Sequence, residues 1–326
     1  MVDEIVDGFA ALLPRATVTR GEVDRGGREL RWVEVAGTRR TVVFEAGSGA
    51  TSLSWLPAIR ELAELEDARL IAYDRVGIGA SDRLAGFRQV SLATQVGDLI
   101  AVLEAASGTD GSCILVAHSW GGIIAQAVAW RRPELIAGLV FVDIAHEQVS
   151  RRMPRRALRR IQLSYLGWTL LISLGLGGRT LRADSEASVA TWSEDADVRA
   201  RLATADLAYY RSGRRVFAKL LGEMRTALRG SAEAERLRAA PGATLPAVPL
   251  VVLSADPEAA VGSLAGLAPE MAARHRELAD QVPGARYELV SGSGHFIQLD
   301  RPEVVARAIR EVLERADRDQ VASGSV

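Results

Sequence analysis

The sequence predicts an α/β protein: a mostly parallel sheet with helices on both faces and an inserted helical cap. Short apolar runs alternate with stretches of helical periodicity between residues 41 and 142. These apolar runs are continuous, which is typical of parallel strands that are buried on both faces. The alternation stops near residue 147 and resumes near residue 249, so helical residues interrupt the sheet.

The N-terminal part is expected to begin with a helix over residues 3–13, followed by two strands, 16–22 and 28–35. The further strands expected are 41–44, 70–73, 113–117, 139–142, 249–253 and 287–290, and the further helices are 55–65, 91–106, 120–131, 267–280 and 303–316. The expected organisation is a core of residues 1–146 and 246–318, a helical cap of residues 147–245 and a flexible tail of residues 319–326.

Composition and charge exclude several classes of function. Hydrophobic residues make up 48% and charged residues 25% of the chain, and the formal net charge is −1, so no global field favours nucleic acid. The single cysteine, Cys113, excludes an internal disulfide, and the histidines lack paired metal-binding spacing, so neither a metal nor an organic cofactor is expected. The acidic residues 1–7 lack the basic region of a secretion signal, which indicates a cytoplasmic enzyme.

An apolar stretch lies inside the expected cap. Residues 163–176 are strongly apolar and are flanked by arginines on both sides. The stretch is shorter than the ~20 residues that span a bilayer, so no integral membrane segment is expected. We interpret it as a lid helix over an apolar pocket; the alternative is an interfacial anchor.

A serine stands in a sharp turn between an expected strand and helix. Residues 117–121 read Ala-His-Ser-Trp-Gly, directly after the apolar run that ends at Val116. A strand–turn–helix of this kind holds the Ser119 hydroxyl clear of the sheet and places backbone N–H groups beside it. Gly121 supplies the small residue that the turn needs, whereas Ala117 stands where glycine is usual.

A base and an acid can be assigned to this serine from strand ends. His295 follows a strand in a glycine-rich loop, so we expect it to be the base for Ser119. Asp256 follows the strand 249–253 and gives the chain order Ser, Asp, His, so it is the preferred partner of His295. Asp143 is the rival, because it also follows a strand.

Other residues are expected to complete the site. The backbone N–H groups of Ser48 and Trp120 are the candidate donors to an oxyanion, and Gly47 lets the loop approach the substrate. His146 is expected to line the pocket. His118 is interpreted as a packing residue and His275 as an exposed residue of a polar helix.

With these residues in place, the chain resembles the α/β-hydrolase superfamily, and more narrowly its lidded branch of esterases, cofactor-free haloperoxidases and proline iminopeptidases. The resemblance is carried by residues 44–49, residues 73–82, the turn at Ser119, Asp256, and residues 294–296 with 300–302 behind them. Ala46 stands where histidine is usual in the oxyanion loop. At the position of Ser119, proteins that resemble the epoxide hydrolase and haloalkane dehalogenase branches have an aspartate. The serine of this chain therefore disfavours those two reactions.

The triad and the resemblance together imply a serine hydrolase of carboxylic esters, including lactones or thioesters, that works through an acyl-enzyme and needs no cofactor. An apolar small-molecule substrate is expected, with no nucleic-acid partner. The alternatives are amide, peptide or C–C bond hydrolysis, or acyl transfer and cyclisation, on the same triad. A non-catalytic receptor with this fold is a further alternative. The sequence leaves the substrate, the pathway and the oligomeric state open.

Overall fold

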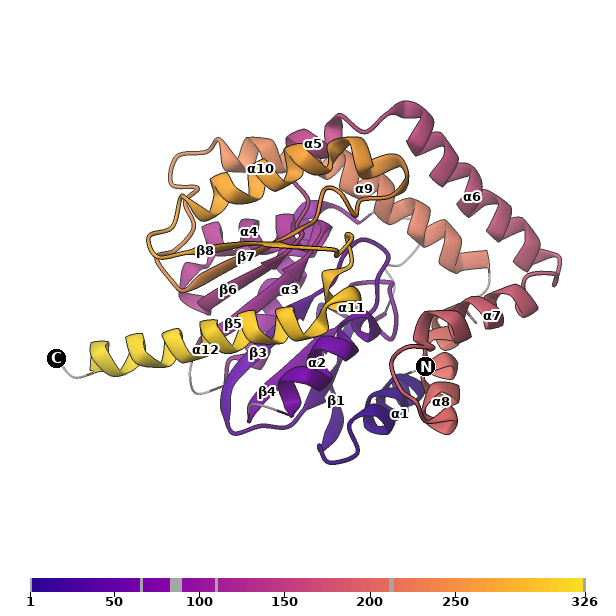
Figure 1. The fold of residues 1–326 in the computed structure, drawn as a ribbon, viewed down its shortest axis with the longest axis horizontal. Coiled ribbons are helices and arrows are strands. Elements are labelled where there is room, and N and C mark those ends of the chain that lie inside the picture. Colours follow the sequence, from indigo (N-terminus) through magenta and orange to yellow (C-terminus); the bar gives the residue numbers. More distant parts are fainter. Residues whose placement is uncertain (1, 65–66, 83–89, 109–110, 211–213, 325–326) are drawn as a thin grey trace.

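The computed structural model describes residues 2–64, 67–82, 90–108, 111–210 and 214–324, and its centre is one sheet of eight strands in the order β1-β2-β4-β3-β5-β6-β7-β8 (Figure 1). The strands are β1 Val18–Asp24, β2 Glu29–Val35, β3 Arg39–Glu45, β4 Ala68–Tyr73, β5 Cys113–His118, β6 Ile136–Val142, β7 Leu250–Ala255 and β8 Arg286–Val290. β2 is antiparallel to β1 and β4, and every pair from β4 to β8 is parallel. The carboxyl ends of the parallel strands therefore share one edge, where ligands bind in such sheets.

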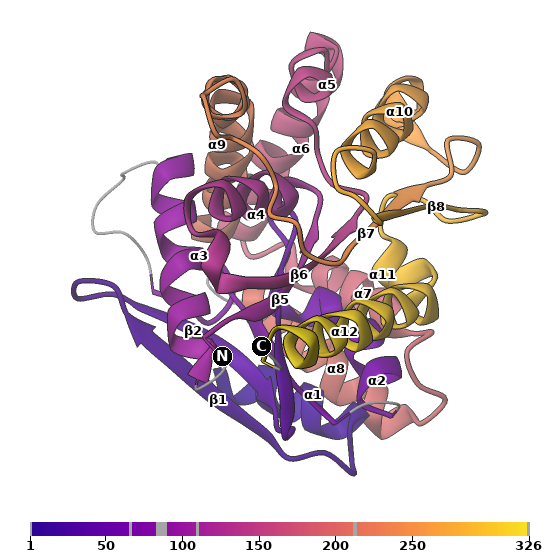
Figure 2. The same ribbon diagram turned by 90° about the vertical axis from the view of Figure 1, so that its left-hand side faces the viewer.

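Helices cover both faces of this sheet. The helices outside the cap region are α1 Val2–Leu12, α2 Leu56–Ala63, α3 Leu92–Ala106, α4 Trp120–Arg131, α10 Ala268–Ala279, α11 Ile297–Asp300 and α12 Pro302–Gly324. Figure 2 shows the sheet between α3 and α4 on one side and α2 and α12 on the other. Together with short 3₁₀ turns, these elements confirm the mostly parallel α/β architecture that the sequence predicts.

The continuous apolar strands feed two separate cores. In β3, Val42 and Phe44 join the core under α2 and α12, whereas Val43 joins the core under α3 and α4. β5 divides in the same way, with Val116 on the first side and Leu115 on the second. All five side chains are fully buried. A strand that is apolar at every position is stable only when both faces are covered, as they are here.

The regular elements described between β6 and β7 are all helices. It contains α5 Glu147–Arg151, α6 Arg155–Ser173, α7 Gly178–Val189, α8 Ala196–Tyr210 and α9 Arg214–Arg238. Figure 1 shows α6, α7 and α8 at one end of the molecule, away from α12. The N-terminal helix α1 packs against α8, and a Cβ at Gly8 would lie 2.9 Å from Ala205 Cβ. The inserted helical region is thus tied to the core at its far end.

Two details differ from what the sequence suggested. The tail expected over residues 319–326 is helical as far as Gly324, and Arg39 and Arg40 hold the last turns of α12 through Asp317. The leucines of the apolar stretch 163–176 face solvent and not a pocket, with Leu163 and Leu174 more than 60% exposed. Trp168 and Ile172, on the opposite side of α6, pack inward.

Candidate active site

Ser119 lies in a strained turn between β5 and α4. Its φ of 52° and ψ of −124° place it in a region that non-glycine residues rarely adopt. The carbonyl of Ser119 accepts hydrogen bonds from Gly122 N (3.0 Å) and Ala145 N (2.8 Å), which fix the turn. Because the strain is held by both neighbouring elements, the hydroxyl is presented at the carboxyl edge of the sheet.

Close approaches explain two glycines around this turn. A Cβ at Gly121 would lie 2.5 Å from Ala46 O, and a Cβ at Gly47 would lie 3.1 Å from Ser119 Cβ. Any larger residue at these positions would push the turn away from the loop after β3. Ala117, by contrast, is fully buried in the core under α3 and α4, so its methyl group fits where glycine was expected.

The imidazole of His295 lies against this hydroxyl. His295 follows β8, and its Nε2 is 3.0 Å from Ser119 Oγ. Its main-chain carbonyl accepts a hydrogen bond from His118 Nε2 at 2.9 Å, and the two rings lie 4.7 Å apart. Burial lowers the pKa of His118 to about 3, so His118 is neutral and serves as a fixed support for the His295 loop. The two residues that the sequence paired, Ser119 and His295, are brought together.

Asp143, and not Asp256, binds the other side of this imidazole. His295 Nδ1 donates to Asp143 Oδ2 at 2.6 Å, so Nε2 is left to accept from the serine hydroxyl. Asp143 is the first residue after β6, has a φ of 40°, and accepts a hydrogen bond from Ala255 N at 2.9 Å through Oδ1. Burial alone would raise the pKa of Asp143, but the hydrogen bond from His295, the electrostatic interaction with the nearby imidazoles and the Ala255 N–H outweigh it, and the pKa is lowered.

The preference for Asp256 as the partner of His295 is therefore wrong in this geometry. Asp256 Oδ1 accepts from Glu258 N at 3.0 Å, and Oδ2 accepts from Gly292 N at 2.9 Å. These backbone N–H groups lower its pKa, and the side chain is outside the buried interior. Asp256 is a turn residue: both of its oxygens hold the loops after β7 and β8.

His275 is a residue that the sequence did not reveal. It was expected on the exposed side of a polar helix, but it is only 1% exposed. Its Nε2 donates to Ile144 O at 2.7 Å, and its Nδ1 accepts from Ser254 Oγ at 2.9 Å, 3.8 Å from Asp143 Oδ1. Burial lowers its pKa. In the sequence, His275 is a single histidine in a polar helix. Helical periodicity does not show that α10 packs over the ends of β6 and β7, so the burial of His275 could not be predicted.

His146 lies three residues beyond Asp143, at the start of α5. Its Nδ1 accepts a hydrogen bond from Gln148 N at 3.3 Å, so the imidazole caps this short helix. Burial lowers its pKa, and Glu147 beside it is paired with Arg238 of α9. The structure thus gives His146 a capping role, and a contact with substrate remains a prediction.

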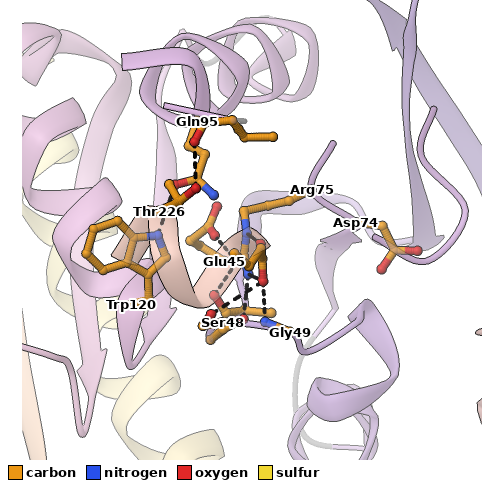
Figure 3. A network of polar contacts seen from close by, with 12 residues as sticks. Glu45, Ser48, Gly49, Asp74, Arg75, Gln95, Trp120 and Thr226 are labelled. Carbon is orange, nitrogen blue, oxygen red and sulfur yellow. Dashed lines mark hydrogen bonds and ion pairs between the residues drawn. The ribbon is translucent and has the colours of Figure 1, made fainter. Parts of the chain in front are cut away.

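The loop that carries Gly47 and Ser48 is held from behind by a buried cation (Figure 3). Arg75 donates to the carbonyls of Ala46 and Gly47, each at 2.5 Å, and pairs with Glu45 at 2.6 Å. Its side chain is 2% exposed. The charges of its carboxylate partners raise the pKa of Arg75 although burial, the largest single influence, would lower it.

A second carboxylate that binds Arg75 comes from the inserted helices. Glu223 of α9 pairs with Arg75 at 3.0 Å and accepts hydrogen bonds from Gly49 N and, at 3.5 Å, from Ser48 Oγ. Glu223 is 7% exposed. Three buried charges remain favourable only when they satisfy one another, so this contact fixes α9 against the loop after β3.

Trp120, the residue after the nucleophile candidate, is anchored through its side chain. Its indole Nε1 donates to Gln95 Oε1 of α3 at 2.9 Å, and the ring is buried against Gly230 of α9. Its backbone N–H lies at the start of α4, where helix N–H groups have no partner within the helix. In the part of the chain that the structure describes, no group of three or more His, Cys, Asp or Glu side chains is arranged to hold a metal ion.

Comparisons with known proteins agree with this architecture. The chain is 31% identical to Epoxide hydrolase 4 of Mus musculus over 96 residues, which are 29% of this chain and 26% of that protein. The chain spans less than half of the length of the curated relatives that it matches first. Among solved structures, the Cif epoxide hydrolase from Acinetobacter nosocomialis has a TM-score of 0.67 and 17% identity, with 96% of this chain and 97% of that chain covered.

A second solved structure, Est816, is described as an N-acyl homoserine lactone degrading enzyme. Its TM-score is 0.59 at 20% identity, and 89% of this chain and 99% of that chain are covered. Identities of this size show a shared fold and leave the substrate class open. The sequence profile of the Alpha/beta hydrolase family matches residues 42–308, which include Ser119, Asp143 and His295. The chain therefore belongs to the alpha/beta hydrolase family.

Proposed function

We propose that this protein is a serine hydrolase of carboxylic esters, with lactones and thioesters in the same class, and that it works through an acyl-enzyme. The observation that carries the proposal is the hydrogen-bonded chain from Ser119 through His295 to Asp143. Nucleophile, base and orienting carboxylate lie within bonding distance at the turn where this family places its nucleophile.

In the proposed first step, Ser119 Oγ attacks the ester carbonyl carbon while its proton passes to His295 Nε2. The C–O bond to the alcohol then breaks, and His295 returns the proton to the leaving oxygen. In the second step, water loses a proton to His295 and attacks the acyl carbon, which releases the acid and restores Ser119. Asp143 stays ionised throughout and stabilises the imidazolium, in keeping with its lowered pKa.

The backbone N–H groups of Ser48 and Trp120 are the proposed donors to the oxyanion. A trans peptide directs its N–H opposite to its C=O, and Arg75 binds the carbonyl of Gly47. The N–H of Ser48, in the same peptide, therefore points away from Arg75. A Cβ at Gly47 would lie 3.1 Å from Ser119 Cβ, so this loop runs beside the nucleophile, which supports the assignment.

The nucleophile type supports acyl transfer over epoxide or alkyl halide opening. A carboxylate nucleophile that opens an epoxide leaves an ester, which water can cleave. A serine alkoxide would instead leave an ether at Ser119, and the site has no means to hydrolyse an ether. Similarity to epoxide hydrolases is thus similarity of fold, and the serine directs the chemistry toward carbonyl compounds.

The test is a substrate panel on the purified chain. We expect turnover of short and medium p-nitrophenyl esters or of acyl lactones, with acyl-Ser119 detected by mass spectrometry after rapid acid quench. Ser119→Ala should show none of this activity. If aminoacyl amides were hydrolysed and no ester or lactone were, the proposal would be replaced by amide hydrolysis on the same residues. Folded protein with no turnover and no acyl adduct would favour a non-catalytic receptor.

A further inference from the structure

The cap helix α6 has two apolar sides, and only one of them is used inside the molecule. Trp168 and Ile172 pack inward against the small core formed by Ile78, Leu181 and Tyr209. On the other side of α6, and in the turn that follows it, a row of leucines is exposed to solvent. These leucines, 43–66% exposed, are Leu163, Leu166, Leu170, Leu171, Leu174 and Leu176.

The exposed leucines form one continuous stripe. Residues 163, 166, 170 and 174 recur at the spacing of three and four that places side chains on one face of a helix. The stripe runs along most of α6, which lies at the edge of the molecule (Figure 1). Contiguous exposed leucines on such a face indicate a surface that is covered during function.

Charge on this segment is segregated from the rest of the chain. Residues 148–183 contain eight arginines and no aspartate or glutamate, in a chain whose net charge is −1. Exposed arginines flank the stripe at both ends: Arg156, Arg159 and Arg160 precede it, and Arg179 and Arg182 follow it. Leucine on one face with arginine at its borders is the composition of helices that lie in the interface of an anionic bilayer.

We propose that α6 docks this protein on the surface of a membrane that contains anionic lipid. The leucines enter the boundary between headgroups and acyl chains, and the arginines bind the lipid phosphates. In the described residues no helix is long and apolar enough to cross a membrane, so the contact is peripheral. Docking of this kind would bring the cap, and the site beside it, to substrates that dissolve in the bilayer.

The same charges disfavour a second copy of the chain as the occupant. Paired α6 helices would place arginine-rich ends together in either orientation, because both ends of the stripe are positive. Like charges at close range oppose association, whereas a negative surface attracts them. The stripe and its flanks are therefore complementary to lipid and not to themselves.

The test is co-sedimentation of the full chain with vesicles, one set of phosphatidylcholine alone and one with about a third phosphatidylglycerol. We expect binding to the anionic vesicles at low salt, little binding to the neutral ones, and loss of binding in high salt. L166S/L170S should weaken the partition coefficient by about tenfold or more, because it removes the inserted apolar groups. R159Q/R160Q should weaken it by a similar factor.

The matched control is R20Q/R132Q, which removes the same charge from outside the cap and should bind as the wild type does. Circular dichroism and esterase turnover of soluble substrate should be unchanged in all variants. No sedimentation with anionic vesicles, equal binding to neutral vesicles, or unchanged binding by both α6 variants would overturn the proposal. A dimer in sedimentation velocity that L166S/L170S converts to a monomer would overturn it in favour of self-association.

Discussion

The loops after β6 and β7 begin with the same residue type but use it differently. The two strands are parallel neighbours, and Asp143 and Asp256 are the first residues beyond them. Asp143 is 8% exposed and turns inward to His295, whereas Asp256 binds the main-chain N–H groups of Glu258 and Gly292. Position after a strand therefore does not decide which carboxylate serves a base. What decides is which oxygen remains free and faces the imidazole.

The largest effect is expected from exchanging the two carboxylates for amides. Asp143→Asn should lower kcat by roughly 10⁴, because an amide no longer holds His295 in the tautomer that accepts from Ser119. Asp256→Asn, the matched control, should change kcat by less than about twofold, because its oxygens bind the N–H groups of Glu258 and Gly292. Steady-state kinetics on the best ester of the panel measure both.

A larger loss of kcat in Asp256→Asn than in Asp143→Asn would contradict the roles assigned to the two aspartates. If Asp256→Asn lost more activity than Asp143→Asn, the loop after β7 would have to rearrange toward His295 during turnover. Urea denaturation of both variants separates this outcome from simple unfolding.

A second experiment concerns how the insert holds the oxyanion loop. Glu223→Gln removes the negative charge that binds Arg75 and Gly49 N, and we expect a tenfold to hundredfold fall in kcat with a small change in KM. Glu235→Gln is the control on the same helix, because Glu235 makes an exposed pair with Arg151. Equal kinetics for the two variants would show that α9 does not position the loop.

A third, smaller effect is expected from His275, which hydrogen-bonds to Ile144 after β6 and to Ser254 in β7. His275→Phe leaves Ile144 O and Ser254 Oγ without their partner and should cost about 1–3 kcal/mol of stability. We expect kcat to fall about tenfold if the residue acts by holding Asp143. In that case the double variant with Asp143→Asn should lose no more activity than Asp143→Asn alone. Additive losses would reduce His275 to a packing residue.

The smallest effect concerns stability at mildly acidic pH. Burial lowers the pKa of His118 and His275, so below about pH 6.5 the unfolded chain binds more protons on these two residues than the folded protein does. Stability must therefore fall as pH falls through this window. His118, with a folded-state pKa of about 3, contributes about 1–2 kcal/mol of this loss between pH 7 and pH 5, and His275 adds to it in the same direction. Urea midpoints at both pH values check this, and His275→Phe should lose less than the wild type. An identical loss in the variant would show that folding does not lower the pKa of His275.

Much of the core was predictable because local signals and tertiary structure agree there. Continuous apolar runs predicted the buried strands, and the strand–turn–helix at Ser119 together with the loop at His295 located two of the three site residues. The choice between Asp143 and Asp256 depended on chain order, which says nothing about where a carboxylate points. That direction is set by the φ of 40° at Asp143 and by Ala255 N, both consequences of packing.

The insert was less predictable for a physical reason. The apolar stretch 163–176 suggested a lid helix, and α6 is helical as far as Ser173, but an apolar side predicts burial only if something covers it. In α6 the inner side is covered and the leucine stripe is not. Arg75, Glu223 and His275 were missed because buried polar and charged side chains find partners that lie far away in the sequence. The residues next to them in the sequence do not indicate which distant side chains they will bind.

The most direct test of the central claim is the rate at which a fluorophosphonate probe labels Ser119, because it needs no knowledge of the substrate. Wild type and Asp256→Asn should be labelled at similar rates, with the adduct on Ser119 by peptide mass spectrometry. Asp143→Asn should react at least about a hundredfold more slowly, and Ser119→Ala should not react. Rapid labelling of Asp143→Asn, or a folded wild type that resists the probe, would contradict the account.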